Sequence, residues 1–161
     1  GVYGTGWAEG KVIPSFELID QYDEAFDLHQ FYGYYVILDI SAGWCGPCRS
    51  TAAKAQEFFE EMREEYGAIL VHVLMDTNSS GQAPDATFLT SWQDDYGLAF
   101  PVCREKNHRT TTQNTMATGL GGSTIPFIIL INDEMVIDSA YGSNSEDAIK
   151  ERIIELSGEE E

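Results

Sequence analysis

Two cysteines separated by Gly-Pro stand between an apolar run and a long amphipathic segment, and this arrangement restricts the fold more than any other feature. The apolar run 34–40 is rich in β-branched and aromatic residues, which predicts a strand buried on both faces. Segment 47–66 carries apolar residues at spacings of three and four, which predicts a helix with one buried stripe. Pro47 suits the first turn of that helix, where a missing N–H has no partner to lose. Cys45 and Cys48 are therefore predicted at a strand-to-helix junction.

The start of a helix favours a sulfur anion. Its first backbone N–H groups lack partners and form the positive end of the helix dipole, which typically lowers a thiol pKa from about 8.5 toward about 7. Cys45 stands at this position and is expected to attack a substrate disulfide. Cys48 lies one turn inside, so we expect it to be more buried and to resolve the mixed disulfide.

A Cys-x-x-Cys pair can also bind zinc or form a purely structural disulfide. Zinc needs two more ligands, and the remaining candidates do not form a second paired set: Cys103, His29, His72 and His108. A disulfide that closes so short a loop stabilises a fold only slightly. Redox chemistry without a metal or other cofactor is therefore favoured.

Length and composition predict one soluble domain. A chain of 161 residues with 43% hydrophobic residues can bury one sizeable core. No stretch approaches the ~20 apolar residues that span a bilayer. With 9 basic and 27 acidic residues the net charge is −18, which argues against nucleic-acid and membrane-surface binding. We expect a monomer whose acidic surface serves solubility.

The domain is expected to occupy residues 14–157, after a flexible Gly-rich arm at 1–13 and before an acidic tail at 158–161. The first residue is Gly rather than Met, which suggests that an initiator methionine has been removed; the sequence leaves open whether a leader or lipid anchor was removed with it.

The coarse pattern predicts an α/β fold with a mixed sheet and helices on both faces. A capping-box pattern at 143–146 is expected to open the last helix. Segment 104–123 is polar and Thr-rich and is predicted as a long loop with one helical turn near 115–120. The other predicted strands are 15–19, 25–28, 68–75, 100–103, 127–131 and 135–140. A second helix is predicted to start near 84, and the last helix is predicted to end at 156.

The run from Trp44 to Cys48 after an apolar strand resembles the active site of the thioredoxin superfamily, and Thr124-Ile125-Pro126 before a strand resembles its cis-proline loop. Residues 14–20 and 100–102 resemble a subgroup, the TlpA/ResA-like proteins and their AhpC/TSA-related (alkyl-hydroperoxide-reductase-like) relatives. The resemblance covers residues 14–156. It implies a thioredoxin-like fold, with a mixed central β-sheet flanked by helices and an N-terminal β-hairpin extension.

The resemblance also implies roles for individual residues. Asp39, six positions before Cys45, matches the buried acid that exchanges a proton with the resolving thiol, and burial favours such a base because it disfavours the charged carboxylate. His72 stands where the family often pairs this acid with a lysine. The residues expected to contact substrate are Trp44, Gly46, Pro47, Ile125 and Pro126.

The expected function is reduction of disulfides in protein substrates, with an upstream dithiol donor that restores Cys45 and Cys48. Gly-Pro between the cysteines resembles reducing thioredoxins. A thiol peroxidase is an alternative, but Ala42 and Leu38 stand where the peroxidase pattern has Thr or Ser and Pro. A non-catalytic interaction module is a second alternative. By resemblance the compartment is a bacterial cell envelope or periplasm, with the cytoplasm as the alternative.

Two further features are interpreted as unrelated to this chemistry. Cys103 on a predicted strand is expected to be a small buried hydrophobe, with a third redox thiol as the alternative. Residues 76–81 imitate the opening of a calcium loop, but Thr87 and Pro84 occupy the twelfth and ninth positions, which argues against calcium.

Overall fold

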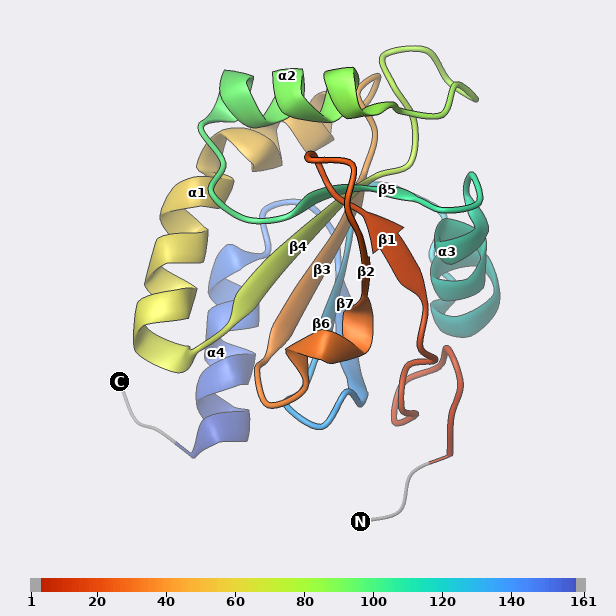
Figure 1. Cartoon of the computed structure of the whole chain (residues 1–161). Helices are drawn as coiled ribbons and strands as arrows, with labels where there is room; N and C mark the ends of the chain where they lie inside the picture. The colour runs from red at the N-terminus through yellow and green to blue at the C-terminus, as the bar shows by residue number, and fades with distance from the viewer. Residues whose placement is uncertain (1–3, 159–161) are drawn as a thin grey trace.

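A mixed sheet forms the centre of the computed structural model, which describes residues 4–158 apart from the side chains of 117 and 118 (Figure 1). Within this part of the chain the strand order is β2-β1-β5-β4-β3-β6-β7. Strands β3, β4 and β5 are parallel, and the other pairings are antiparallel. The strands are β1 Glu17–Ile19, β2 Ala25–Asp27, β3 Val36–Ser41, β4 Ile69–Leu74, β5 Val102–Glu105, β6 Phe127–Ile131 and β7 Ile137–Tyr141.

Helices cover both faces of this sheet, as the sequence predicts. Figure 1 shows α1 and α4 on one side and α3 on the other. The helices are η1 Leu28–Phe31, α1 Gly46–Tyr66, α2 Ala86–Tyr96, α3 Thr110–Thr112, the π-helical η2 Gln113–Leu120 and α4 Glu146–Ser157. The sheet separates two hydrophobic cores, one on each face. Every residue of β3 is buried, and its apolar side chains alternate between these two cores. Leu38 faces one core and Ile37 faces the other, which confirms the predicted central strand.

Helix α1 forms where the apolar periodicity places it. Cys45 is its N-cap and a proline lies in its first turn, where no intrahelical N–H is needed. Gly67 ends the helix in the left-handed conformation at φ 64°, which glycine adopts without a Cβ clash. Its buried stripe, Ala52, Ala55, Phe59 and Met62, fixes the helix against the sheet. The packing of α1 therefore sets the position of the dithiol at its N-terminus.

The prediction of a long loop at 104–123 is wrong, although the helical turn predicted near 115–120 is confirmed within a longer helical segment. Strand β5 extends to Glu105, and residues 110–120 form α3 and η2. The Glu105 carboxylate accepts hydrogen bonds from the N–H and the hydroxyl of Thr112, at 2.9 and 3.0 Å, and so holds the first helical turn. Threonine favours helices weakly, so local propensity could not predict this element. A contact with the preceding strand and burial of Met116 in the core stabilise it instead.

The described part of the predicted arm, residues 4–13, is hydrogen-bonded to the sheet. The N–H groups of Gly10 and Ile13 donate to the carbonyls of Ile137 and Met135, at 2.8 and 2.9 Å. The side chain of Ile13 is fully buried. This segment therefore lies along the sheet edge next to β7. Residues 1–3 of the arm and 159–161 of the predicted tail lie outside the described residues.

The predicted capping box at 143–146 does not form. Ser145 is the N-cap of α4, and its hydroxyl donates backward to the carbonyl of Gly142 instead of accepting from the helix. The acidic residues Glu146 and Asp147 in the first turn still suit the positive end of the helix dipole.

Candidate active site

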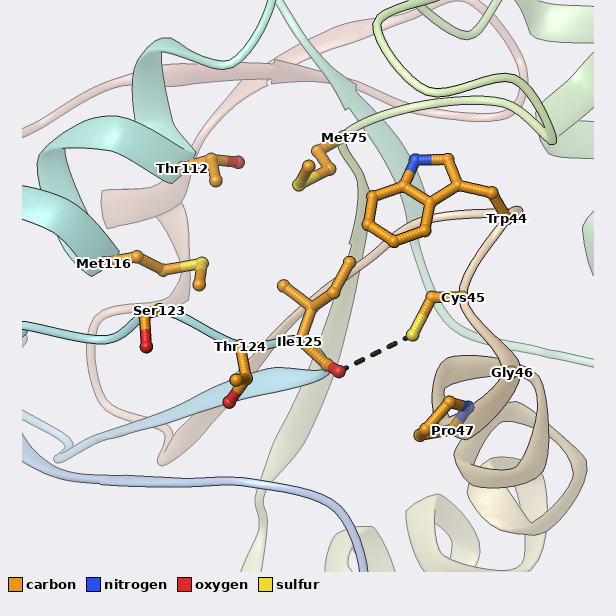
Figure 2. A pocket seen from close by; sticks show the side chains of 10 residues that line it. All are labelled: Trp44, Cys45, Gly46, Pro47, Met75, Thr112, Met116, Ser123, Thr124 and Ile125. Atoms are coloured by element: carbon orange, nitrogen blue, oxygen red, sulfur yellow. Dashed lines mark hydrogen bonds between the residues drawn. The ribbon is translucent and has the colours of Figure 1, made fainter.

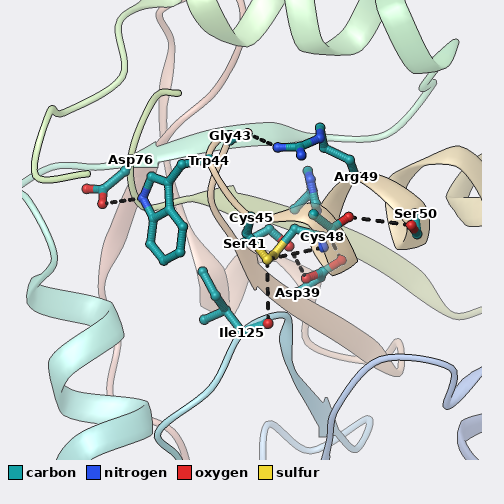
Figure 3. Close-up of a disulfide and its surroundings, with 12 residues drawn as sticks. Asp39, Ser41, Gly43, Trp44, Cys45, Cys48, Arg49, Ser50, Asp76 and Ile125 are labelled. Carbon is teal, nitrogen blue, oxygen red and sulfur yellow. Dashed lines mark hydrogen bonds and ion pairs between the residues drawn. A yellow bond between two sulfur atoms is a disulfide. The ribbon is translucent and has the colours of Figure 1, made fainter. Parts of the chain in front are cut away.

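Cys45 and Cys48 form a disulfide at the N-terminus of α1, with their Cα atoms 5.2 Å apart (Figure 3). The N–H of Cys48 donates to Cys45 Sγ at 3.2 Å, so the outer sulfur acts as the helix cap. Cys45 is 5% exposed and Cys48 is fully buried. The sulfur at position 45 is thus the one nearer to solvent, and it lies at the positive end of the helix.

The loop that ends at Pro126 faces this sulfur. The Ile125–Pro126 peptide bond is cis, and the Ile125 carbonyl oxygen lies 3.5 Å from Cys45 Sγ (Figure 2). Strand β6 begins one residue later and pairs with β3, the strand that leads into the dithiol. The sheet therefore brings together two segments that are 80 residues apart in the chain.

A groove of about 470 Å³ opens beside Cys45. Among the residues expected to contact substrate, Trp44, Gly46, Pro47 and Ile125 line it, and Pro126 follows directly at the cis bond. Thr124, from the predicted cis-proline loop, also lines it, and sequence reasoning missed the rest of the lining: Met75, Thr112, Met116 and Ser123. Figure 2 shows the Met75 and Met116 side chains on the side of the groove opposite α1. The groove wall near the sulfur is thus largely apolar.

Asp76, which the sequence suggested only as a failed calcium ligand, fixes Trp44 beside the groove. Its side chain is fully buried. The carboxylate accepts a hydrogen bond from Trp44 Nε1 at 2.9 Å (Figure 3). It also accepts from the Gly81 N–H at 3.0 Å, from His108 Nε2 at 2.8 Å and from Arg109 Nε at 3.2 Å, with a further bond from Arg109 Nη2.

The charge of Asp76 is stabilised by these donors. Burial on its own raises the pKa of the carboxyl, but the hydrogen bonds from Arg109 above all, then from Gly81, Trp44 and His108, hold the pKa well below its ordinary value. Asp76 therefore carries a negative charge at neutral pH, and it joins the dithiol loop to the segment before α3. The presence of an aspartate directly after a buried strand was the available sequence signal.

Asp39 lies on β3, the strand behind the disulfide in Figure 3, and is 5% exposed. The hydroxyl of Ser41 donates to Asp39 Oδ1 at 2.8 Å. His72 faces it from the neighbouring strand, where the parallel register pairs the two residues, and His72 Nδ1 lies 3.2 Å from Asp39 Oδ2. Both oxygens of the carboxylate thus have hydrogen-bond partners.

Cys103, the remaining thiol, does not line the groove beside Cys45. Cys103 is fully buried on β5, as expected for a small hydrophobe, and burial above all, with the charge of Asp20, raises the pKa of its thiol. Within residues 4–158, no group of three or more His, Cys, Asp or Glu side chains is arranged to hold a metal ion. No helix in that range is long and apolar enough to span a membrane.

Comparison with known proteins identifies relatives that are named as a thioredoxin-like protein and a thiol-disulfide oxidoreductase. The chain is 28% identical to the thioredoxin-like protein YneN of Bacillus subtilis over 70% of this chain and 63% of YneN. It is 30% identical to the thiol-disulfide oxidoreductase ResA of Oceanobacillus iheyensis over 61% of this chain and 49% of ResA. The chain therefore spans between about half and two thirds of the length of these relatives.

Among solved structures, the thioredoxin domain of a thiol-disulfide oxidoreductase from Bacteroides vulgatus matches 91% of this chain and 98% of that domain. Its TM-score is 0.70 and its sequence identity is 15%, which shows a thioredoxin-like fold. The model of the AhpC/TSA family matches residues 10–140, a range that contains the dithiol, the buried acid and the cis-proline loop. The chain belongs to the AhpC/TSA family.

Proposed function

We propose that this protein exchanges thiols and disulfides with protein substrates and that it acts mainly as a reductase. The observation that carries the proposal is the Cys45–Cys48 pair at a helix N-terminus, with its outer sulfur in a groove beside a cis-proline loop. The oxidoreductase names of the relatives support the same chemistry.

The reaction begins from the reduced pair. Cys45 is the N-cap residue, where the helix dipole and the N–H of Cys48 stabilise a thiolate. This thiolate attacks one sulfur of the substrate disulfide, the substrate S–S bond breaks, and the other substrate sulfur leaves as a thiolate. The product is a mixed disulfide between Cys45 and the substrate.

Cys48 then resolves the mixed disulfide. Asp39 accepts the Cys48 proton, and the Cys48 thiolate forms the S–S bond to Cys45 as the bond to the substrate breaks. The substrate leaves fully reduced and the enzyme is oxidised by two electrons. An upstream dithiol donor reduces Cys45–Cys48 again. The groove lined by Trp44 and Ile125 would hold the chain of the substrate on either side of its cysteine.

Reduction of insulin by dithiothreitol tests the proposal. We expect the native protein to accelerate it and Cys45→Ser to abolish the acceleration. Cys103→Ala, which removes the buried third thiol, is the matched control and should retain activity. Equal background rates for the native and Cys45→Ser proteins would instead indicate a non-catalytic docking module. Peroxide consumption without insulin reduction would indicate the peroxidase alternative.

Two further measurements address direction and partners. A reductase should have a potential nearer ~−270 mV, and a value near ~−120 mV would reverse the assigned direction. Cys48→Ser cannot resolve its mixed disulfide and should trap substrate proteins for identification. We propose a monomer in the bacterial cell envelope, on the resemblance to TlpA/ResA-like proteins, and the compartment of the trapped partners tests that placement.

A further inference from the structure

A hydrogen-bonded chain connects helix α2 to the acid behind the dithiol. Trp92 on α2 donates its indole N–H to Nε2 of His72, at 3.0 Å. The other ring nitrogen of His72, Nδ1, lies 3.2 Å from Asp39 Oδ2. This inference rests on the proposed function, in which Asp39 takes the proton of Cys48.

The chemistry of the three groups determines where the protons are. An indole N–H can only donate, so Nε2 of His72 must offer a lone pair to Trp92. A histidine with an unprotonated Nε2 is neutral and carries its hydrogen on Nδ1. That hydrogen points at the Asp39 carboxylate and makes a charge-assisted hydrogen bond. If His72 were doubly protonated, its Nε2–H and the indole N–H of Trp92 would be two donors facing each other without an acceptor.

The side chains of Trp92, His72 and Asp39 are shielded from water by their surroundings. Trp92 and Asp39 are each 5% exposed and His72 is 1% exposed. The Trp92 ring stacks on His72 with centroids 5.9 Å apart, and the Phe100 ring meets it edge-on at 6.4 Å. The ionisable group that faces His72 from β3 is Asp39, whereas α2 and the segment before β5 present aromatic rings. Water cannot readily replace Trp92 as the partner of Nε2.

We propose that Trp92 is a positioning residue that holds His72 as its neutral Nδ1–H form, so that Asp39 is oriented without a cation beside it. The lysine that the family often has at this position would bring a permanent positive charge, which stabilises the carboxylate and weakens it as a base. Here His72 orients Asp39 by one hydrogen bond and leaves it free to accept the Cys48 proton. Resolution of the mixed disulfide thus depends on a residue of α2 that does not touch the dithiol.

The test combines a spectrum with a rate. Long-range ¹H–¹⁵N correlation spectra of the oxidised native protein report which ring nitrogen of His72 is protonated, and a His72→Gln sample assigns the signals. The rate of substrate release from the mixed disulfide is measured in the native protein, in Trp92→Phe and in Tyr96→Leu. Trp92→Phe removes the indole N–H. Tyr96→Leu is the matched control, because Tyr96 packs on Trp92 with centroids 4.8 Å apart and leaves that N–H in place.

We expect a neutral Nδ1–H His72 in the native protein at pH 7. Trp92→Phe should shift His72 toward its charged or Nε2–H form and slow release about tenfold, the size of one lost charge-assisted hydrogen bond, and Tyr96→Leu should do neither. A native His72 that is charged, or protonated on Nε2, overturns the inference even if insulin is reduced. A native protein that has the expected His72 form but never reduces insulin instead refutes the proposed function.

Discussion

Replacing Asp76 by Asn should destabilise the fold because it removes a buried charge on which three segments converge. Asp76 is fully buried, while the side chains of its partners His108 and Arg109 are about one third exposed, at 32% and 33%. The exposed partners can turn to water, so the loss lies at the low end of the range for breaking a buried pair. We expect a decrease of about 2–3 kcal/mol in the free energy of unfolding at pH 7.

The stabilisation that Asp76 provides should depend on pH, because folding lowers the pKa of its carboxyl. The pKa of Asp76 in the folded protein lies below its ordinary value of 3.8, which applies to the unfolded chain. The stabilisation is therefore fully present above that ordinary value and is lost as the pH falls through it toward the folded pKa. The difference in unfolding free energy between the native protein and Asp76→Asn should shrink between pH 5 and pH 2.5.

Urea unfolding of the oxidised proteins, followed by far-ultraviolet circular dichroism across this pH range, measures the difference. Asp133→Asn is the matched control, because it removes the same charge from an exposed position. It should change the stability by about 0.5 kcal/mol or less at every pH. An Asp76→Asn protein as stable as the native one at pH 7, or a difference that stays constant down to pH 2.5, would refute the reasoning.

Two further predictions concern the close packing around Gly43 and the burial of Cys103. A Cβ atom on Gly43 would lie 2.6 Å from Asn78 Oδ1 and 2.7 Å from Phe88 Cζ, so Gly43→Ala should lower the unfolding free energy by about 1–3 kcal/mol. Gly142→Ala, where a Cβ meets open space, should not, and equal urea midpoints for both would contradict this. In the oxidised protein the Cys103 thiol should react with Ellman's reagent only in denaturant, because it is fully buried and its pKa is raised. Rapid reaction of one thiol under native conditions would show that Cys103 is accessible.

Much of the fold could be predicted because its signals are local. Helix α1 and strand β3 follow from the spacing of apolar residues, which depends only on the geometry of helices and strands. Of the helix at 110–120, only a turn near 115–120 was predicted, since its first threonines favour helices weakly and Glu105 on the preceding strand holds its first turn. The capping box was a local signal that failed, because α4 begins later than the pattern places it, with Ser145 rather than Ser143 as its N-cap.

By itself, the sequence determined the elements of the proposed chemistry: two thiols at a helix start, an acid six positions before the first of them and a proline before a strand. Residue type and short spacing are sufficient for these features. Only the tertiary structure decided that Asp76 holds Trp44, that Met75 and Met116 line the groove, and that Trp92 reaches His72. Such contacts join residues 20 or more positions apart, and the packing of helices on the sheet, rather than any local pattern, brings them together.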